Sequence, residues 1–197
     1  MALVEICVSD VNTAIEAWEG GADRLELCTN LWEGGTTPSY AYVEHCLKEL
    51  PIPCFPLLIP RGGNYFYSNL EKKILMRDAE YFVKLGAKGL VIGALNEYKR
   101  IDIDFMKSFM NEFAALEITF HKAFDDVENP FDALDTLYDL KVKRILTSGC
   151  KPTALEGKHL IKQLIEKNKI QILVAGGVNE INALEIIEYT GATEIHA

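Results

Sequence analysis

Two cysteines and two glutamates form a repeated pattern near the N-terminus. The sequence Glu-x-Cys occurs at Glu5 and Cys7 and again at Glu26 and Cys28, each time in a short apolar run that predicts a β-strand. Because side chains alternate along a strand, the Glu and the Cys of each run share one face, and the more apolar residues occupy the other. We therefore expect both glutamates and both cysteines to point inward, away from the helices that cover the sheet.

Two thiols on neighbouring parallel strands could share a soft metal ion. Such strands lie about 4.8 Å apart, and thiolate ligands favour Cu(I) or Zn(II). Two thiolates in a linear arrangement would suffice for Cu(I). Two other interpretations of Cys7 and Cys28 stay open: each can be a small buried hydrophobic residue, and a disulfide is a third choice that is rare in a reducing compartment.

The two inward glutamates need partners, since an unpaired buried carboxylate is very costly. The nearest candidates in the sequence are Arg61, in the loop after the third predicted strand, and His121 with Lys122 at the end of the fifth. A catalytic role for Glu5 and Glu26 and a structural network of ion pairs inside the fold are equally compatible with this pattern.

Three loops that follow predicted strands contain glycine, which lets backbone N–H groups approach an anion closely. Arg61 lies in the first loop and Ser148 in the second, and Gly176 and Gly177 form the third. The third loop precedes a predicted helix start at Asn179, so it could hold a phosphate or carboxylate. We expect Glu5, Arg61, Ser148, Gly176 and Gly177 to bind a small anionic ligand.

Strand-like and helix-like runs alternate along the whole chain, which demands parallel strands joined by crossover helices. Eight such strands predict a (β/α)8 TIM barrel. A doubly wound sheet is the competing arrangement, but the glycine fingerprint of a dinucleotide site is absent. The predicted strands are 3–8, 24–28, 54–59, 89–93, 117–121, 143–147, 170–174 and 193–196, and the predicted helices are 10–20, 38–50, 68–86, 102–115, 130–140, 153–168 and 179–190.

The eighth strand uses up the 197 residues, so the final helix of the barrel is missing from this sequence. We expect residues 1–197 to form a single barrel domain with an open flank near 193–197. Either the chain continues, or a neighbouring subunit covers this side. We expect a homo-oligomer.

The composition argues against several partners. A formal net charge of −9 disfavours nucleic acid and anionic membranes, and no apolar run is long enough to span a bilayer. The N-terminal residues lack the pattern of a secretion signal. Five scattered cysteines fit a reducing cytoplasm, where we expect the protein to be located.

The sequence resembles the copper homeostasis protein CutC family. The resemblance lies in stretches that run in order along nearly the whole chain: VEICV at 4–8, GGADRLELC at 20–28, EGGTTPS at 33–39, PRGG at 60–63, VIGA at 91–94, TFH at 119–121, AFD at 123–125, LTSG at 146–149 and ALEG at 154–157. It implies a TIM barrel, a cytoplasmic location, a role in copper binding or tolerance, and oligomers in some members.

The resemblance also assigns the metal ligands, because the cysteines of the first two strands match Cys7 and Cys28. The chain departs from the family at four places, with Ile59, Asn64, Lys122 and Ala175 where the family usually has Arg, Asp, Arg and Gly. The loss of one arginine and one aspartate weakens any anion site that needs both.

Two functions follow from these residues. The first is a cytoplasmic copper-binding protein of copper homeostasis, with Cu(I) held by Cys7 and Cys28. The alternative is a TIM-barrel enzyme that acts on a small anionic metabolite, with Glu26 and His121 as acid and base at the C-terminal mouth of the barrel and Arg61 holding the anion.

Overall fold

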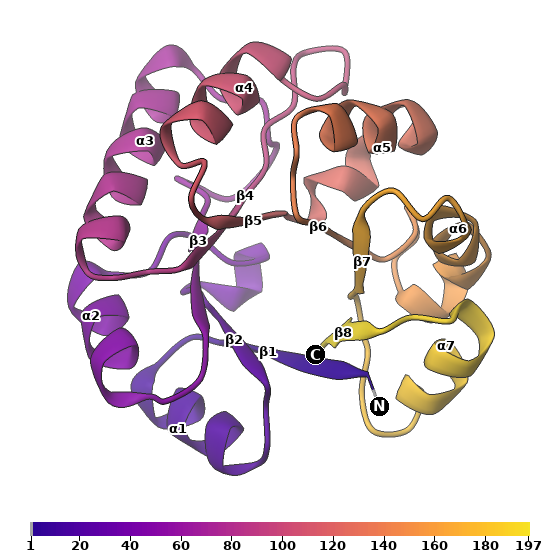
Figure 1. Cartoon of the computed structure of the whole chain (residues 1–197), viewed down its shortest axis with the longest axis horizontal. Helices are drawn as coiled ribbons and strands as arrows, with labels where there is room; N and C mark the ends of the chain where they lie inside the picture. Colours follow the sequence, from indigo (N-terminus) through magenta and orange to yellow (C-terminus); the bar gives the residue numbers. More distant parts are fainter. Residues whose placement is uncertain (1) are drawn as a thin grey trace.

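Eight parallel strands close into a barrel with helices around the outside (Figure 1). The structure, a computed structural model, describes residues 2–197. Each strand pairs with its neighbours in chain order, and β8 pairs with β1 to complete the ring. The predicted (β/α)8 barrel is confirmed. The strands are β1 (Leu3–Val8), β2 (Arg24–Leu27), β3 (Cys54–Leu58), β4 (Gly89–Ile92), β5 (Glu117–Phe120), β6 (Arg144–Thr147), β7 (Gln171–Val174) and β8 (Glu194–His196).

The helices begin at residues that satisfy their free N–H groups. Asp10 caps the first helix, and Ser68 forms a capping box with Glu71 at the third. The α-helices are α1 (Val11–Glu19), α2 (Tyr40–Glu49), α3 (Asn69–Lys84), α4 (Ile103–Glu112), α5 (Pro130–Asp139), α6 (Ala154–Glu166) and α7 (Ala183–Thr190), and two short 3-10 helices are η1 (Leu31–Glu33) and η2 (Lys122–Asp126).

The start of α7 differs from the prediction. The helix begins at Ala183 rather than at Asn179. The side-chain carbonyl of Asn179 accepts hydrogen bonds from the backbone N–H groups of Ile181 and Asn182, which closes a turn before the helix. Asn179 therefore ends the preceding loop, and it does not cap the helix as the sequence suggested.

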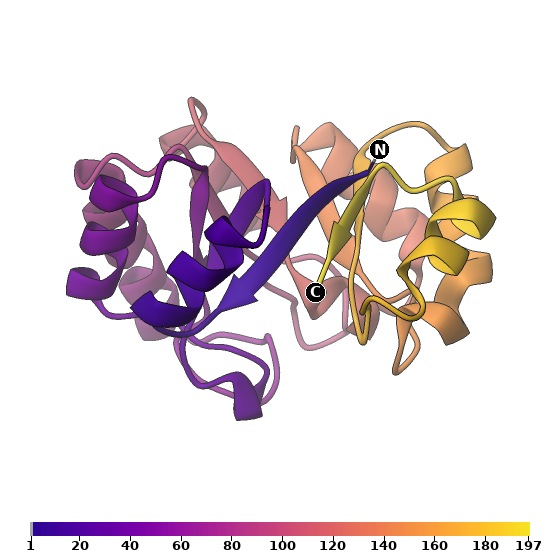
Figure 2. The ribbon, with the colours of Figure 1, turned by 90° about the horizontal axis from the view of Figure 1, so that it is seen from below.

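No helix follows β8 within residues 2–197, as expected. The strand layer is nevertheless closed at this position: Ala197 donates its N–H to the Glu5 carbonyl and accepts from the Cys7 N–H. Figure 2 shows β1 and β8 side by side, with the C-terminus at the end of β8. The missing helix therefore concerns only the outer layer, and Val4 and Ile6 of β1 are half-buried and pack against the hydrophobic core.

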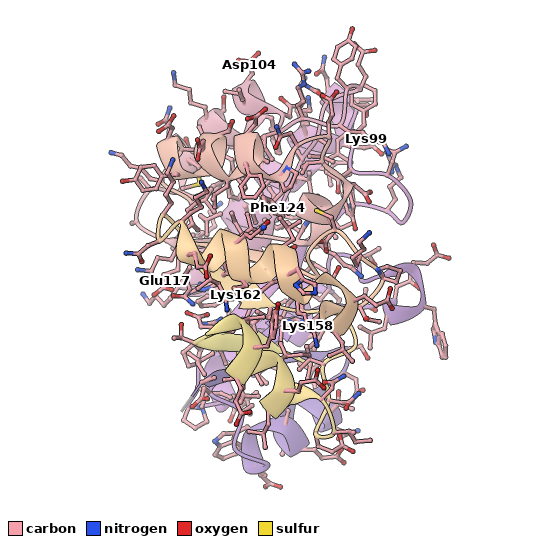
Figure 3. All side chains as sticks on the ribbon, turned by 90° about the vertical axis from the view of Figure 1, so that its right-hand side faces the viewer. Lys99, Asp104, Glu117, Phe124, Lys158 and Lys162 are labelled. Carbon is pink, nitrogen blue, oxygen red and sulfur yellow. The ribbon has the colours of Figure 1, made fainter. Side chains whose placement is uncertain are left out.

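The core has an outer and an inner part. The outer part packs the outward strand residues against the helices. On the surface of this layer, Lys158 and Lys162 of α6, labelled in Figure 3, place their ammonium groups 5.0 and 5.3 Å from the ring centre of Tyr189 in α7. None of the helices in the described residues is long and apolar enough to cross a membrane.

The inner part of the core is charged toward the N-terminal ends of the strands. Arg24 lies 2.6 Å from Glu194, and Arg144 bridges Glu194 at 3.2 Å and Glu117 at 2.7 Å. Both guanidinium groups lie over the Phe55 ring, 5.4 and 5.5 Å from its centre. This layer fills the interior below the mouth with paired charges, which is the costly but satisfied arrangement that buried ions require.

Candidate functional site

A cavity of about 440 Å³ opens at the mouth of the barrel, where the C-terminal ends of the strands meet. This is the end at which TIM barrels carry their sites, and the volume suits a small ligand. Hydrophobic side chains such as Leu57 and Ile59 form part of the wall. The polar groups that line it include Cys7, Glu26, His121, Lys122 and His196.

The two predicted metal ligands are in contact. The Sγ atoms of Cys7 and Cys28 lie 3.4 Å apart. Cys28 follows the last residue of β2, and its backbone N–H donates to the Val8 carbonyl, which holds it beside the end of β1. The hydrogen bond to Cys28 and burial raise the pKa of the Cys7 thiol far above its usual range. Without a metal, Cys7 is therefore a protonated thiol.

Cys7 also contacts a carboxylate, which in turn faces an imidazole. Its Sγ donates to Oε2 of Glu26 at 3.2 Å, and that oxygen lies 3.9 Å from Nε2 of His196. The ligand-type atoms of Cys7, Glu26 and His196 all lie within 4.8 Å of one another. Burial raises the pKa of Glu26, although the positive charge of His196 opposes the shift.

Glu5 is fully buried and does not line the cavity. One carboxylate oxygen accepts from Arg24, and the other lies 2.8 Å from Nδ1 of His196. Burial alone would raise the pKa of Glu5, but the hydrogen bond with His196 and the charges of His196 and Arg24 outweigh it, and the pKa is lowered. The expected partners of Glu5, which were Arg61, His121 and Lys122, are not the ones present.

His196 responds to the same contacts in the opposite direction. Burial by itself lowers the pKa of His196, but the hydrogen bond with Glu5 and the negative charges of Glu26 and Glu5 together raise it above the usual histidine value. The imidazole therefore lies between two glutamates, with Nδ1 toward Glu5 and Nε2 toward Glu26.

His121 lines the cavity with an unused hydrogen-bonding atom. The residue is 2% exposed, and its ring centre lies 4.9 Å from that of Tyr65, with the two ring planes tilted by 45°. Nδ1 accepts from the Ala123 backbone N–H at 3.1 Å, whereas Nε2 has no partner among residues 2–197. Burial lowers the pKa of His121 to about 3, so the ring is neutral at pH 7 and carries its proton on Nε2.

The ring of His121 also explains the glycine on the neighbouring strand. A Cβ atom at Gly93, just after β4, would lie 2.7 Å from the ring atoms Cε1 and Nδ1. Only glycine leaves room for the imidazole there without a shift of the ring.

Arg61 does not line the cavity. Its Nε donates to Glu71 at 2.6 Å at the start of α3, and its other nitrogens donate to the carbonyls of Asn64 and Phe66 in its own loop. The structure therefore does not bring Arg61 together with Glu5, Glu26 or His121. Its guanidinium ties the loop after β3 to the helix that follows.

Ser148 is hydrogen-bonded to Asp125, which was not among the predicted site residues. Its hydroxyl contacts the carboxylate of Asp125 and the Lys151 carbonyl. Asp125 also accepts from the hydroxyl of Thr147 and from the backbone N–H groups of Ser148 and Cys150. Asp125 therefore holds the loop after β6 in shape, and Ser148 does not line the cavity.

Gly176 and Gly177 do line the cavity. Both have positive φ angles, 101° and 68°, which glycine adopts without strain. Among residues 2–197, the backbone N–H groups of Gly176, Gly177 and Val178 have no protein acceptor. The loop therefore offers backbone donors that no protein group uses, and the anion-binding role of Gly176 and Gly177 stays a prediction.

Three contributors to the site escaped the sequence analysis: His196, Arg24 and Asp125. Arg24 could have been found from strand alternation, because it shares the inward face with Glu26, which was already a candidate. His196 shares a face with Glu194, which was not a candidate, so alternation alone did not single it out. For Asp125, which follows β5 in a 3-10 helix, no periodic signal existed.

Comparisons with known proteins place the chain among relatives of one kind. The CutC family model matches residues 2–197. The human copper homeostasis protein cutC homolog is 45% identical over 196 residues, which cover 98% of this chain and 72% of the human one. The family protein CutC of Pasteurella multocida is 38% identical over 195 residues, covering 98% of this chain and 80% of the relative.

Solved structures agree with this result. A structure named for the copper homeostasis protein CutC of Streptococcus agalactiae matches with a TM-score of 0.94 and 33% identity, over 100% of this chain and 98% of that one. Phosphoribosylanthranilate isomerase of Thermotoga maritima matches with a TM-score of 0.64 and 15% identity, over 100% of this chain and 87% of that one. The second likeness shows the fold alone.

Proposed function

Because the chain belongs to the CutC family, we propose that it binds copper as Cu(I) through Cys7 and Cys28, at the mouth of the barrel, in copper homeostasis. The observation that carries this proposal is the contact of the two thiols, 3.4 Å apart beside the cavity. Thiolates are the soft ligands that Cu(I) prefers. The names of the relatives, which refer to copper homeostasis, support the same ion.

The geometry sets one requirement for the copper site. With the zinc–thiolate bond length of about 2.3 Å as a guide, two thiolates on opposite sides of an ion would lie about 4.6 Å apart. The two sulfur atoms must therefore separate by roughly 1 Å on binding, or the sulfur–copper–sulfur angle must be well below 180°. Both thiols also lose their protons, so binding weakens as the pH falls.

A competition titration tests the copper proposal. Reduced protein is titrated with Cu(I) without oxygen against a chromophoric chelator. Cys7→Ala and Cys28→Ala should each lower the Cu(I) affinity by more than about 100-fold. This exceeds the loss expected for a residue that contacts a metal ligand and not the metal itself. Cys150→Ala removes another half-buried thiol and is the control. Equal Cu(I) affinity in the wild type and the Cys7→Ala, Cys28→Ala double variant would refute the site.

A cytoplasmic location and a homo-oligomer belong to the same proposal. All five cysteines are free thiols, and thiol ligands for Cu(I) persist in a reducing compartment. Light scattering of the purified protein at several concentrations measures the assembly, and a monomer throughout would contradict it.

A second candidate function is an enzyme or binding protein for a small anionic metabolite. The observation that favours it is the buried Nε2–H of His121, which has no partner among the described residues and belongs to a residue that lines the cavity. Lys122 and the free N–H groups of the Gly176 loop lie around the same cavity. With a pKa of about 3, His121 serves as a neutral donor, so the acid–base role falls to Glu26.

Calorimetry separates this candidate from copper binding. Metal-free protein is titrated with inorganic phosphate, a phosphate monoester and a dicarboxylate. A hydrogen bond to a charged ligand contributes about 1.5 to 3 kcal/mol. His121→Asn should therefore lower the affinity for whichever of these anions binds by about 10- to 100-fold. The control is His159→Asn, at an exposed histidine on α6. Absence of binding, or equal binding by both variants, would contradict this function.

A further inference from the structure

Three side chains beside the thiol pair are arranged as ligands for one ion. Sγ of Cys7 lies 3.2 Å from Oε2 of Glu26, and this oxygen lies 3.9 Å from Nε2 of His196. Tetrahedral ligands at zinc-type bond lengths of about 2.0 to 2.3 Å lie about 3.3 to 3.8 Å from one another. The three atoms are all within 4.8 Å of one another, so small rotations bring them to bonding distance of a common centre.

The orientation of His196 fits this role. Its Nδ1 lies 2.8 Å from Oε1 of Glu5, and Glu5 is fixed in turn by Arg24. This contact leaves Nε2 as the free ring nitrogen on the side of Glu26 and Cys7. Metal-bound histidines almost always hold their other nitrogen on a carboxylate or carbonyl in this manner. The buried Glu5 therefore has the position of a carboxylate that orients a metal-bound histidine without contacting the metal.

The ligand types select a different ion from the cysteine pair. One thiolate, one carboxylate and one imidazole combine soft, hard and borderline ligands, a mixture that suits Zn(II) better than Cu(I). The thiolate and the carboxylate together carry two negative charges, which balance a divalent cation. In the metal-free protein Cys7 keeps its thiol proton and donates it in a hydrogen bond to Oε2 of Glu26, so the contact between these two ligand atoms is already made.

We propose that Cys7, Glu26 and His196 form a three-ligand site for a divalent ion of the Zn(II) type, distinct from the Cys7–Cys28 pair. All three residues line the cavity. Three protein ligands leave one tetrahedral position open, the arrangement of zinc sites that bind water or a substrate. The open position would accept a water molecule or an oxygen of a small anion. The site shares Cys7 with the copper site and requires neither Cys28 nor copper binding.

Cobalt provides the test, because Co(II) substitutes for Zn(II) and its bond to a thiolate absorbs in the near ultraviolet. Reduced, metal-free protein is titrated with Co(II) without oxygen. The wild type should show this absorption with one ion bound. Cys28→Ala should keep both the absorption and the affinity within about threefold. His196→Ala and Glu26→Ala should each weaken binding by more than about tenfold, and Cys7→Ala should lose the absorption.

A replacement of one ligand by another strengthens the test. His196→Cys adds a second thiolate at the ligand position and should restore Co(II) binding with a stronger thiolate absorption than the wild type. Melting curves of the metal-free variants show whether each one is folded, and either His196→Ala or Glu26→Ala suffices for the conclusion.

Two results would overturn the proposal. One is a wild type that shows no thiolate absorption with excess Co(II). The other is a Cys28→Ala variant that loses Co(II) while His196→Ala retains it, because the divalent ion would then use the cysteine pair. Cu(I) titrations keep the two proposals separate. His196→Ala should bind Cu(I) as the wild type does, because His196 is not a proposed copper ligand. Loss of Cu(I) binding by Cys28→Ala bears only on the copper site, because the divalent site does not use Cys28.

Discussion

Nδ1 of His196 lies 2.8 Å from Oε1 of Glu5, across the seam where β8 meets β1. The contact joins residues 191 positions apart in the chain. It connects the charged interior of the barrel, through Arg24, to the polar groups at the mouth. The seam therefore both closes the sheet and orients the imidazole beside Glu26 and Cys7.

Replacement of Glu5 should destabilise the protein strongly. Glu5→Gln leaves Arg24 and His196 without their buried carboxylate, and the loss of one partner of a buried ion pair costs about 3 to 5 kcal/mol. Urea denaturation measures the free energy of unfolding. The control is Glu128→Gln, which makes the same change at the exposed pair with Arg100 and should cost less than about 1 kcal/mol. Equal losses in the two variants would show that the seam network contributes little.

The stability of the protein should fall in mild acid because of His121. The folded pKa of His121 is about 3, against an ordinary value of 6.5, so between these values the unfolded chain binds more protons than the folded one. The free energy of unfolding therefore falls as the pH drops through this window, by up to about 1.4 kcal/mol per pH unit. His121→Asn keeps an acceptor for the Ala123 N–H and removes the titration.

Urea denaturation at pH 6.5 and at pH 4.5 checks this prediction. His121→Asn should lose less stability between the two pH values than the wild type, by about 2 kcal/mol. His159→Asn, at the exposed histidine that bonds the Tyr189 hydroxyl, should follow the wild type. Parallel pH profiles for the wild type and His121→Asn would mean that other groups govern the acid sensitivity.

Asp125 should be more important for stability than its place in a loop suggests. Its carboxylate accepts from Thr147, from both donors of Ser148 and from the Cys150 N–H. Hydrogen bonds to a charged group contribute about 1.5 to 3 kcal/mol, so Asp125→Asn should lower the free energy of unfolding by about 2 to 3 kcal/mol. The neighbouring exposed Asp126 provides the control as Asp126→Asn. Chemical denaturation of both variants measures the free energy of unfolding. Equal stabilities would show that the hydrogen bonds of Asp125 contribute little.

The strands were predictable because their signals are local. Each of the eight begins and ends within one residue of its predicted limits, since a short apolar run with alternation identifies a strand wherever it lies. The start of α7 was wrong by four residues because the side chain of Asn179 closes a turn instead of capping the helix. Local competition of this kind is not visible in residue types alone.

The partners inside the barrel were less predictable because they depend on closure. The pairing of Glu5 with His196 requires that β8 return to β1 in one particular register, Glu5 opposite His196. Arg61 was an attractive partner by charge, but the capping box at Ser68 brings Glu71 to the loop, where it pairs with Arg61. Inward direction could be inferred from alternation, whereas the pairing of charges needed the register of distant strands.

Copper and a divalent ion should exclude each other, because Cys7 belongs to both proposed ligand sets. One equivalent of Cu(I) added to the Co(II)-loaded wild type should remove the thiolate-to-cobalt absorption. In Cys28→Ala the copper pair is broken while Cys7, Glu26 and His196 remain, so the absorption should survive the same addition. Survival of the absorption in the wild type, with one copper and one cobalt bound, would show that the two ions do not compete for Cys7. Its disappearance only when Cys28 is present would identify Cys7 as the ligand that decides which metal the barrel holds.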